Sequence, residues 1–162
     1  MQVLWAPWRM AYVGVAQPPG CIFCNAATTA DRRAALVLAQ RPVLVLLNRF
    51  PYSSGHLMVA PVQHHGDFTT LPADAARVLG DVLQRSAALL REAFTPQGLN
   101  IGMNQGAAGG AGIVDHLHWH LVPRWVGDTN FMPMLAETRV IPEHLAATYE
   151  RLAPLFAPLE TL

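Results

Sequence analysis

The stretch "GIVDHLHWHLVP", residues 112–123, places His116, His118 and His120 at alternate positions, with apolar residues between them. Successive side chains of a β-strand point to opposite faces, so a strand here carries all three imidazoles in a row on one face. The structural alternative is a half-buried strand whose polar face happens to be histidine. Three adjacent imidazoles are costly to place without partners, however, and histidine suits acid/base work, metal binding and nucleophilic attack near neutral pH. We therefore interpret the row as a functional site.

A glycine-rich segment, "GAAGGAG" at residues 106–112, ends four residues before His116. Glycines let backbone N–H groups turn toward an anion without a side chain in the way, whereas the alternative is a long flexible turn. A neutral imidazole is a competent nucleophile toward phosphorus, and a neighbouring imidazole can contact the oxygens that gain charge. The adjacency of loop and histidines therefore predicts phosphate chemistry.

Composition describes one compact domain. The chain has 162 residues, of which 52% are hydrophobic and 14% charged. Eleven basic residues balance eleven acidic ones, so no general basic field favours nucleic-acid binding, and we predict no nucleic-acid partner. Prolines interrupt the apolar N-terminal arm, residues 1–20, before any run reaches the length of a signal or membrane segment. We predict a cytoplasmic protein without a membrane partner.

Hydrophobic patterning predicts an α+β fold. Aliphatic runs bounded by Gly and Pro predict strands, and apolar residues at helical spacing predict helices. The expected elements are two strands within 35–50 joined by a turn near Arg41 and Pro42, strands at 55–61, 98–106 and the histidine run, and helices at 72–94 and 143–156. This order predicts a mainly antiparallel five-stranded sheet with a long helix and a C-terminal helix on one side.

The two cysteines of the chain, Cys21 and Cys24, form a C-x-x-C pair. They are too close together for a disulfide between them to stabilise a secreted fold. In a reducing compartment such a pair is interpreted first as metal-binding or redox-active, and the alternative is two reduced, buried thiols.

Several motifs together resemble those of one known family. "HLHWHLV" matches the pattern His-φ-His-φ-His-φ-φ, with φ apolar, and "LNRFPYSSGHLMVAPVQH", "CIFC" and "GLNIGMNQG" match further segments of the histidine triad (HIT) superfamily of nucleotide hydrolases and transferases. The resemblance covers nearly the whole chain and implies a single HIT domain over residues 21–162. "LWAPWRM", "VPRWVGDTNFMP" and "RVIPEHL" look most like the branch related to diadenosine tetraphosphate phosphorylases. Relatives form homodimers, so the resemblance also implies a homodimer.

The resemblance implies roles for three histidines. His118 is the nucleophile that attacks the α-phosphorus of a nucleotide and forms a nucleotidyl-histidine intermediate. His120 contacts the phosphate and leaving-group oxygens, and His56 lies against the triad and orders its hydrogen bonds. Transferases of the superfamily often have glutamine in place of His120, so its presence makes the chain look closer to the hydrolases.

Nucleotide-binding residues are implied in the same way. Asn104 and the backbone around Gly112 and Ile113 match positions that hold the phosphate. Asn48 falls where many relatives have an acidic residue that binds the ribose hydroxyls. At Gly112 and Ile113 many relatives carry serine or glutamine, so backbone N–H groups have to contribute more here.

A metal site is implied as well. In relatives with this cysteine pair, a histidine after the "GHLMVAP" strand and the first triad histidine complete a tetrahedron, here His64 and His116 with Cys21 and Cys24. Such a closed Cys₂His₂ site holds a structural zinc ion. His65 is adjacent, but the spacing from Pro61 favours His64.

The function expected from these features is cleavage of a purine nucleotide or dinucleoside polyphosphate, such as diadenosine tetraphosphate, at its α-phosphate. Hydrolysis and phosphorolysis both remain open. The alternative from another class is a zinc-stabilised purine-nucleotide-binding protein with little turnover. The full triad favours an enzyme, because a pure binder has no need of a nucleophile beside phosphorus.

Overall fold

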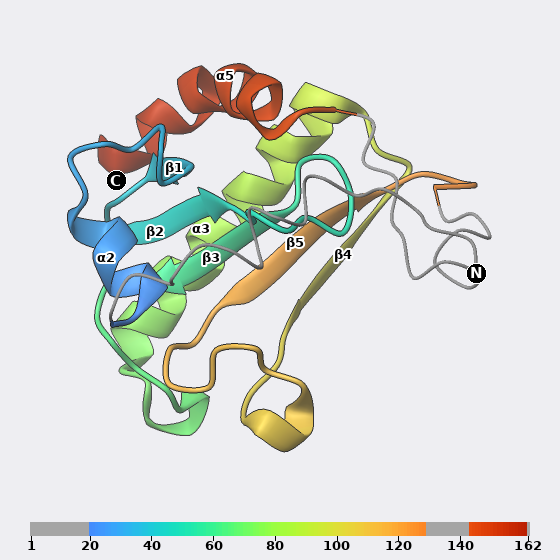
Figure 1. The fold of residues 1–162 in the computed structure, drawn as a ribbon. Helices are drawn as coiled ribbons and strands as arrows, with labels where there is room; N and C mark the ends of the chain where they lie inside the picture. The colour runs from blue at the N-terminus through green and yellow to red at the C-terminus, as the bar shows by residue number, and fades with distance from the viewer. Residues whose placement is uncertain (1–19, 129–142, 162) are drawn as a thin grey trace, which may run out of the picture.

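The computed structural model describes residues 20–128 and 143–161. The arm expected at residues 1–20 lies outside this part of the chain except for Gly20. Of the three segments that resemble the phosphorylase branch, residues 4–10, 129–133 and 139–142 lie outside it as well. Figure 1 shows an open sheet with the helices α3 and α5 packed along it.

The sheet confirms the expected α+β class with antiparallel strands. Its order is β1-β2-β3-β5-β4, and every neighbouring pair is antiparallel. The strands are β1 (Val37–Ala39), β2 (Val43–Leu47), β3 (Leu57–Pro61), β4 (Gly98–Met103) and β5 (Trp119–Arg124). The inner strands β2 and β3 are buried along their whole length, which explains why they consist of uninterrupted apolar residues.

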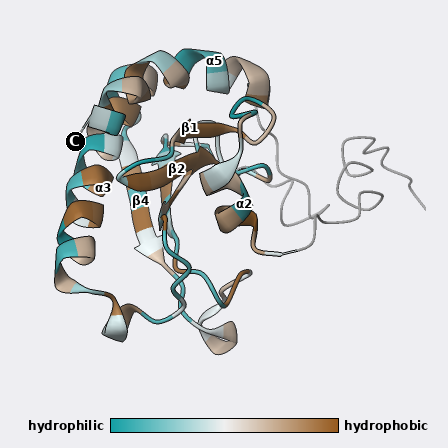
Figure 2. Ribbon diagram, turned by 90° about the vertical axis from the view of Figure 1, so that its left-hand side faces the viewer, coloured by the Kyte–Doolittle hydropathy of each residue, from teal (hydrophilic) through white to brown (hydrophobic). Residues whose placement is uncertain are grey.

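Side chains of β2 alternate between two cores. Val43, Val45 and Leu47 join the core under α3 (Ala73–Phe94) and α5 (Leu145–Phe156), and we call this side of the sheet the helix face. Leu44 and Leu46 pack with Phe23 from α2 (Ile22–Thr28) on the opposite side, which we call the α2 face. The expectation of helices on one side therefore holds for the long helices, whereas α2 covers the other face (Figure 2).

The histidine run forms a strand only in part. The ladder of β5 begins at Trp119, so His116 and His118 precede it, and the Leu117 N–H donates to the His65 carbonyl at 2.7 Å instead. The expected alternation of faces is nevertheless kept. His120 pairs with Met58 of the α2-face core, and Trp119 pairs with Val59 of the helix-face core.

Both expected helices are present with small shifts at their N-termini. α3 begins directly after Pro72 and ends before Thr95, which has a left-handed conformation. α5 begins at Leu145, two residues later than predicted, because the side chain of His144 caps it by accepting from the Ala146 N–H. The chain also contains three short 3₁₀ turns: η2 (Phe68–Thr70) before α3, η3 (Ala107–Gly109) between β4 and β5, and η4 (Ala157–Thr161) after α5. None of the helices in the described ranges has the length and apolar character needed to cross a membrane.

Candidate functional site

His56 is held at the start of β3 by a tight turn. Gly55 has a φ of +76°, and a Cβ atom built on it would lie 2.9 Å from Cε2 of Phe94. Only glycine combines that backbone conformation with so close a neighbour. The His56 carbonyl accepts from the Asn48 N–H at 2.9 Å, and the His56 side chain is fully buried. The turn therefore delivers one imidazole to a defined place on the α2 face.

Hydrogen bonds assign the protons of His56 and His120. The Tyr52 N–H donates to Nδ1 of His56 at 3.0 Å, so in a neutral His56 the proton is on Nε2. Nε2 of His56 lies 2.9 Å from Nδ1 of His120 and donates to it. Nδ1 of His120 is thus an acceptor, and its proton resides on Nε2. Burial lowers the pKa of His120, and the neighbouring His118 lowers it further, which favours this neutral form.

His118 is oriented by the backbone beside it. Its Nδ1 lies 2.9 Å from the carbonyl oxygen of His116, and a carbonyl only accepts, so Nδ1 carries the proton. In the neutral ring Nε2 then holds the lone pair. The rings of His118 and His120 meet edge to face with centroids 5.0 Å apart. His118 thus offers the lone pair of its Nε2 atom beside His120, which offers an Nε2–H.

Two aromatic residues complete this site, and neither was among the predicted site residues. The fully buried ring of Phe23 lies 4.9 Å from the His118 ring and 5.0 Å from the His116 ring, centroid to centroid. Tyr52 lies against His56. In the sequence, the only sign that Phe23 lies at the site is its position between two cysteines. The segment "PYSSGH" does not indicate that Tyr52 contacts His56.

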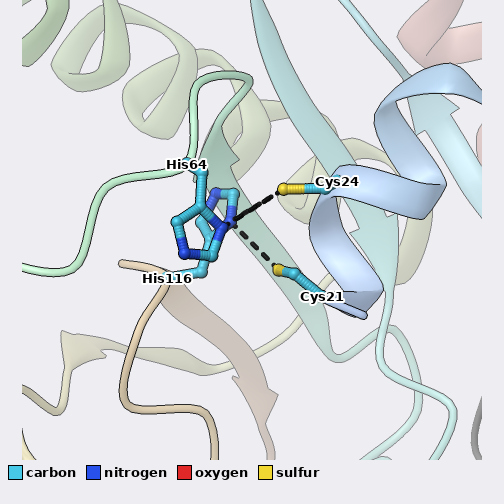
Figure 3. Close-up of side chains that lie close together, drawn as sticks. All are labelled: Cys21, Cys24, His64 and His116. Carbon is cyan, nitrogen blue, oxygen red and sulfur yellow. Dashed lines mark hydrogen bonds between the residues drawn. The ribbon is translucent and has the colours of Figure 1, made fainter. Parts of the chain in front are cut away.

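Four predicted ligands converge on the α2 side of the molecule. Cys21 precedes α2, Cys24 lies within it, His64 follows β3, and His116 precedes β5. One donor atom from each lies within 4.8 Å of every other, and Figure 3 shows the thiols and imidazoles facing one another. Sγ of Cys21 lies 3.2 Å from Nδ1 of His116, and Sγ of Cys24 lies 3.3 Å from Nδ1 of His64.

This donor set fits zinc. Two sulfurs and two nitrogens around one tetrahedral Zn²⁺ lie about 3.3–3.8 Å from one another, close to the separations seen here. Nε2 of His116 donates to the Pro61 carbonyl at 2.9 Å, which leaves its Nδ1 lone pair facing the thiols. Burial lowers the pKa of His116 and so favours the neutral ring that a metal requires. His65 bonds Thr70 instead, at 3.0 Å, so the geometry favours His64 as the ligand.

The predicted phosphate residues border the glycine-rich loop. The side-chain amide of Asn104 donates to the Gly110 carbonyl at 3.3 Å, which ties the loop to the end of β4. Gly106 and Gly110 have φ values of +73° and +84°. Gly112 is exposed, whereas Ile113 packs against the α2-face core.

Asn48 is engaged within its own turn. Its Oδ1 accepts from the Phe50 N–H at 2.9 Å. Its amide nitrogen and the second lone pair of that oxygen are the groups with which it could meet a ribose. A cavity of about 410 Å³ is lined by the neighbouring Arg49 and by residues that include Arg33 and Tyr149, but by none of the predicted site residues.

Comparison with known proteins identifies the family of this chain. The family model of the HIT domain matches residues 30–126. AP-4-A phosphorylase of Mycobacterium tuberculosis is 32% identical over 97% of this chain and 85% of that protein. Protein hit of Bacillus subtilis is 30% identical over 65% of this chain and 71% of its own length.

Solved structures show the same fold. A Zn-bound histidine triad family protein from Mycobacterium smegmatis superposes with a TM-score of 0.66 and 28% identity, over 87% of this chain and 96% of that one. A hypothetical histidine triad nucleotide-binding protein from Sulfolobus tokodaii gives a TM-score of 0.64 at 22% identity, over 87% and 92% of the two chains. With its histidine row on the α2 face and the matching family model, the chain belongs to the histidine triad (HIT) family.

Proposed function

We propose that this protein breaks the α-phosphate linkage of a dinucleoside polyphosphate, such as diadenosine tetraphosphate, through a nucleotidyl-His118 intermediate. The observation that carries the proposal is the hydrogen bond from Nδ1 of His118 to the His116 carbonyl, because it leaves the Nε2 lone pair for attack. The similarity to a protein named AP-4-A phosphorylase supports the choice of substrate.

In the first step, the Nε2 lone pair of His118 forms a bond to the α-phosphorus. The bond between that phosphorus and the bridging oxygen breaks, and its electron pair leaves with the departing nucleotide. The departing polyphosphate is a stable anion, so it needs a hydrogen bond rather than a full proton transfer. The Nε2–H of His120 supplies that bond, and the His116 carbonyl stabilises the positive charge that develops on the His118 ring.

In the second step, an oxygen of water or of inorganic phosphate attacks the same phosphorus. The bond from phosphorus to Nε2 of His118 breaks and returns its electron pair to the ring. A water molecule releases its proton to solvent, whereas a phosphate anion has none to release from the attacking oxygen. The two acceptors give different products, so a product assay separates hydrolysis from phosphorolysis.

The remaining predicted residues bind the substrate in this proposal. Asn104 shapes the glycine-rich loop, whose backbone around Gly112 and Ile113 holds the phosphates. Asn48 meets the ribose through its side-chain amide. Because Asn48 carries no charge, we expect it to contribute a hydrogen bond of about 1 kcal/mol rather than a charge-assisted one.

Cys21, Cys24, His64 and His116 are proposed as the ligands of one structural zinc ion, supported by the Zn-bound relative from Mycobacterium smegmatis. A bound zinc ion would supply a structural cross-link. Because its proposed ligands lie at α2, after β3 and before β5, they would hold α2 against the segment that carries His118. Reduced thiols are required for this, which supports a cytoplasmic location.

A homodimer is also proposed. β4 is one of the two edge strands of the sheet, and Ile101 on it is 51% exposed. An apolar edge strand favours pairing with a second copy of the same edge.

The test is an assay with diadenosine tetraphosphate in the presence and absence of inorganic phosphate. ADP plus ATP indicates phosphorolysis, and AMP plus ATP indicates hydrolysis. The matched control is His118→Asn, which keeps a similar size and a side-chain amide at the Nδ1 position. Saturable nucleotide binding by the wild type without any product would overturn the enzyme and support the zinc-stabilised binding protein.

A further inference from the structure

Tyr52 contacts both histidines of the His56–His120 pair. Its ring centroid lies 4.6 Å from that of His56 and 6.0 Å from that of His120, with an angle of 25° between the Tyr52 and His120 rings. Tyr52 is 54% exposed, whereas His56 is fully buried. The tyrosine ring therefore covers the pair on its solvent side.

The backbone of Tyr52 contacts His56 at the ring nitrogen that faces away from His120. Its N–H donates to Nδ1 of His56, and Nε2 of His56 donates to Nδ1 of His120. One residue thus makes contact at two points of a single hydrogen-bonded chain. The backbone contact selects the tautomer of His56, and the ring restricts how the two imidazoles can turn.

We infer that Tyr52 is a positioning residue that holds His56 and His120 in the one arrangement that leaves the His120 proton on Nε2. The effect of Tyr52 on the reaction rate rests on the function proposed above, whereas its effect on the proton positions does not. Without the ring, the imidazole of His120 has space to turn about its χ2 angle, and the bond from His56 no longer dictates which nitrogen carries the proton.

The Tyr52 ring also limits the access of water to His120. Among the residues that the structure describes, the titratable groups whose rings lie against His120 are His56, His118 and Tyr52 itself. Burial is the main cause of the lowered pKa of His120, so removal of a covering ring is expected to raise that pKa toward its usual value. The acid limb of a rate–pH profile should then move to higher pH.

The experiment uses the full chain labelled with ¹⁵N and long-range ¹H–¹⁵N NMR spectra, which distinguish protonated from bare imidazole nitrogens. In the free wild type we expect bare Nδ1 atoms and protonated Nε2 atoms in both His56 and His120. Tyr52→Ala should give averaged nitrogen shifts for His120 and a raised pKa. Its kcat should fall by roughly 10- to 100-fold with little change in KM, as is typical when a group that orients a functional side chain is lost.

Two further variants separate positioning from general stability. Tyr52→Phe restores a ring of the same shape and should rescue the wild-type nitrogen pattern, and Tyr52→Leu provides a folded alternative if the alanine variant unfolds. The matched control is Phe68→Ala, because Phe68 is 47% exposed and packs on Trp119, which belongs to the helix face. It should lose packing but leave the His56 and His120 nitrogens unchanged.

The possible results are distinct. Unchanged nitrogen shifts in Tyr52→Ala, or in Tyr52→Leu if the former does not fold, would overturn the inference. The same holds if Phe68→Ala disturbs the pair as strongly. A wild type that shows the expected nitrogen pattern but cleaves no nucleotide would overturn the proposed function and leave the positioning role intact.

Discussion

His116 and His118 are joined by a hydrogen bond in which the His116 carbonyl accepts from Nδ1 of His118 at 2.9 Å. The side chain of the same His116 lies with the thiols of Cys21 and Cys24. One residue therefore contributes its backbone to the proposed nucleophile and its side chain to the proposed metal site. A shift of His116 at the proposed metal site is therefore expected to move the carbonyl that orients the proposed nucleophile.

Cys24→Ala tests the metal site. The purified wild type should contain about one zinc ion per chain, measured by mass spectrometry of the metal, and the variant should lose it. Its free energy of unfolding should fall by about 3 kcal/mol or more, because a ligand that binds only the folded state stabilises that state. His65→Ala is the matched control, since His65 bonds Thr70 and not the cluster. Full zinc content in Cys24→Ala would refute the ligand assignment.

Gly55→Ala tests the turn that places His56. The substitution adds a Cβ atom 2.9 Å from the Phe94 ring at a φ of +76°. We expect the free energy of unfolding, from urea titration, to drop by roughly 2 kcal/mol or more. Gly80→Ala is the control, because Gly80 lies within α3 with no atom inside 4 Å of the new Cβ. It should stabilise the helix by about 0.5–1 kcal/mol. Equal effects at both positions would contradict this account of the turn.

Glu160 links the C-terminal η4 turn to the sheet edge. It accepts from the Gln40 N–H at 2.8 Å and forms an ion pair with Arg32 at 2.9 Å. Burial alone would raise the pKa of Glu160, but the hydrogen bonds from Arg32 and Gln40 and the charge of Arg32 outweigh it and lower the pKa. A carboxyl pKa lowered by folding stabilises the protein above the unfolded-state pKa. That stabilisation is lost as pH falls through the folded-state value.

Glu160→Gln should therefore lower stability at pH 7 by about 1 kcal/mol, discounted for the partial exposure of both partners. The difference from wild type should shrink as the pH of the urea titrations falls from 6 toward 3. Glu150→Gln is the control, since Glu150 pairs with Arg33 on the surface with side-chain exposures of 58% and 70%. A difference for Glu160→Gln that stays constant down to pH 3 would argue against the lowered pKa.

Ile101→Lys tests the proposed homodimer. A lysine on the edge strand β4 adds a charge that opposes edge-to-edge pairing. Sedimentation velocity at micromolar concentration should give a dimer for the wild type and a monomer for the variant. Val114→Lys, at an apolar residue that is 44% exposed but lies outside β4, should remain dimeric. A dimeric Ile101→Lys protein would place the interface elsewhere.

Sequence patterns predicted the elements with strong periodicity. β2 and β3 were predictable as apolar runs bounded by Gly and Pro, and α3 was predictable from its helical spacing. α2 was not, because seven residues give too little periodicity to separate a helix from a loop. The start of β5 was placed too early, since the Leu117 N–H bonds the His65 carbonyl rather than a strand partner.

The residue types of the site were predictable, but its hydrogen bonds were not. Spacing and resemblance together named His56, His118 and His120. The nitrogen that carries the proton in each ring depends on the His116 carbonyl and the Tyr52 N–H, and the surrounding loops place both groups. The contact of Phe23 with His118 depends on the docking of α2, which no local pattern records.

The most direct test of the central claim is chemical trapping of the nucleotidyl-histidine. Wild-type protein and His118→Ala are mixed with diadenosine tetraphosphate radiolabelled at its α-phosphorus, quenched rapidly without acid, and digested for peptide mapping. The account predicts an acid-labile label on the His118 peptide of the wild type. It predicts no label in the variant, whose turnover should fall by roughly 10⁴-fold or more. Label that maps to His120, or wild-type turnover in His118→Ala, would contradict the assignment of the nucleophile.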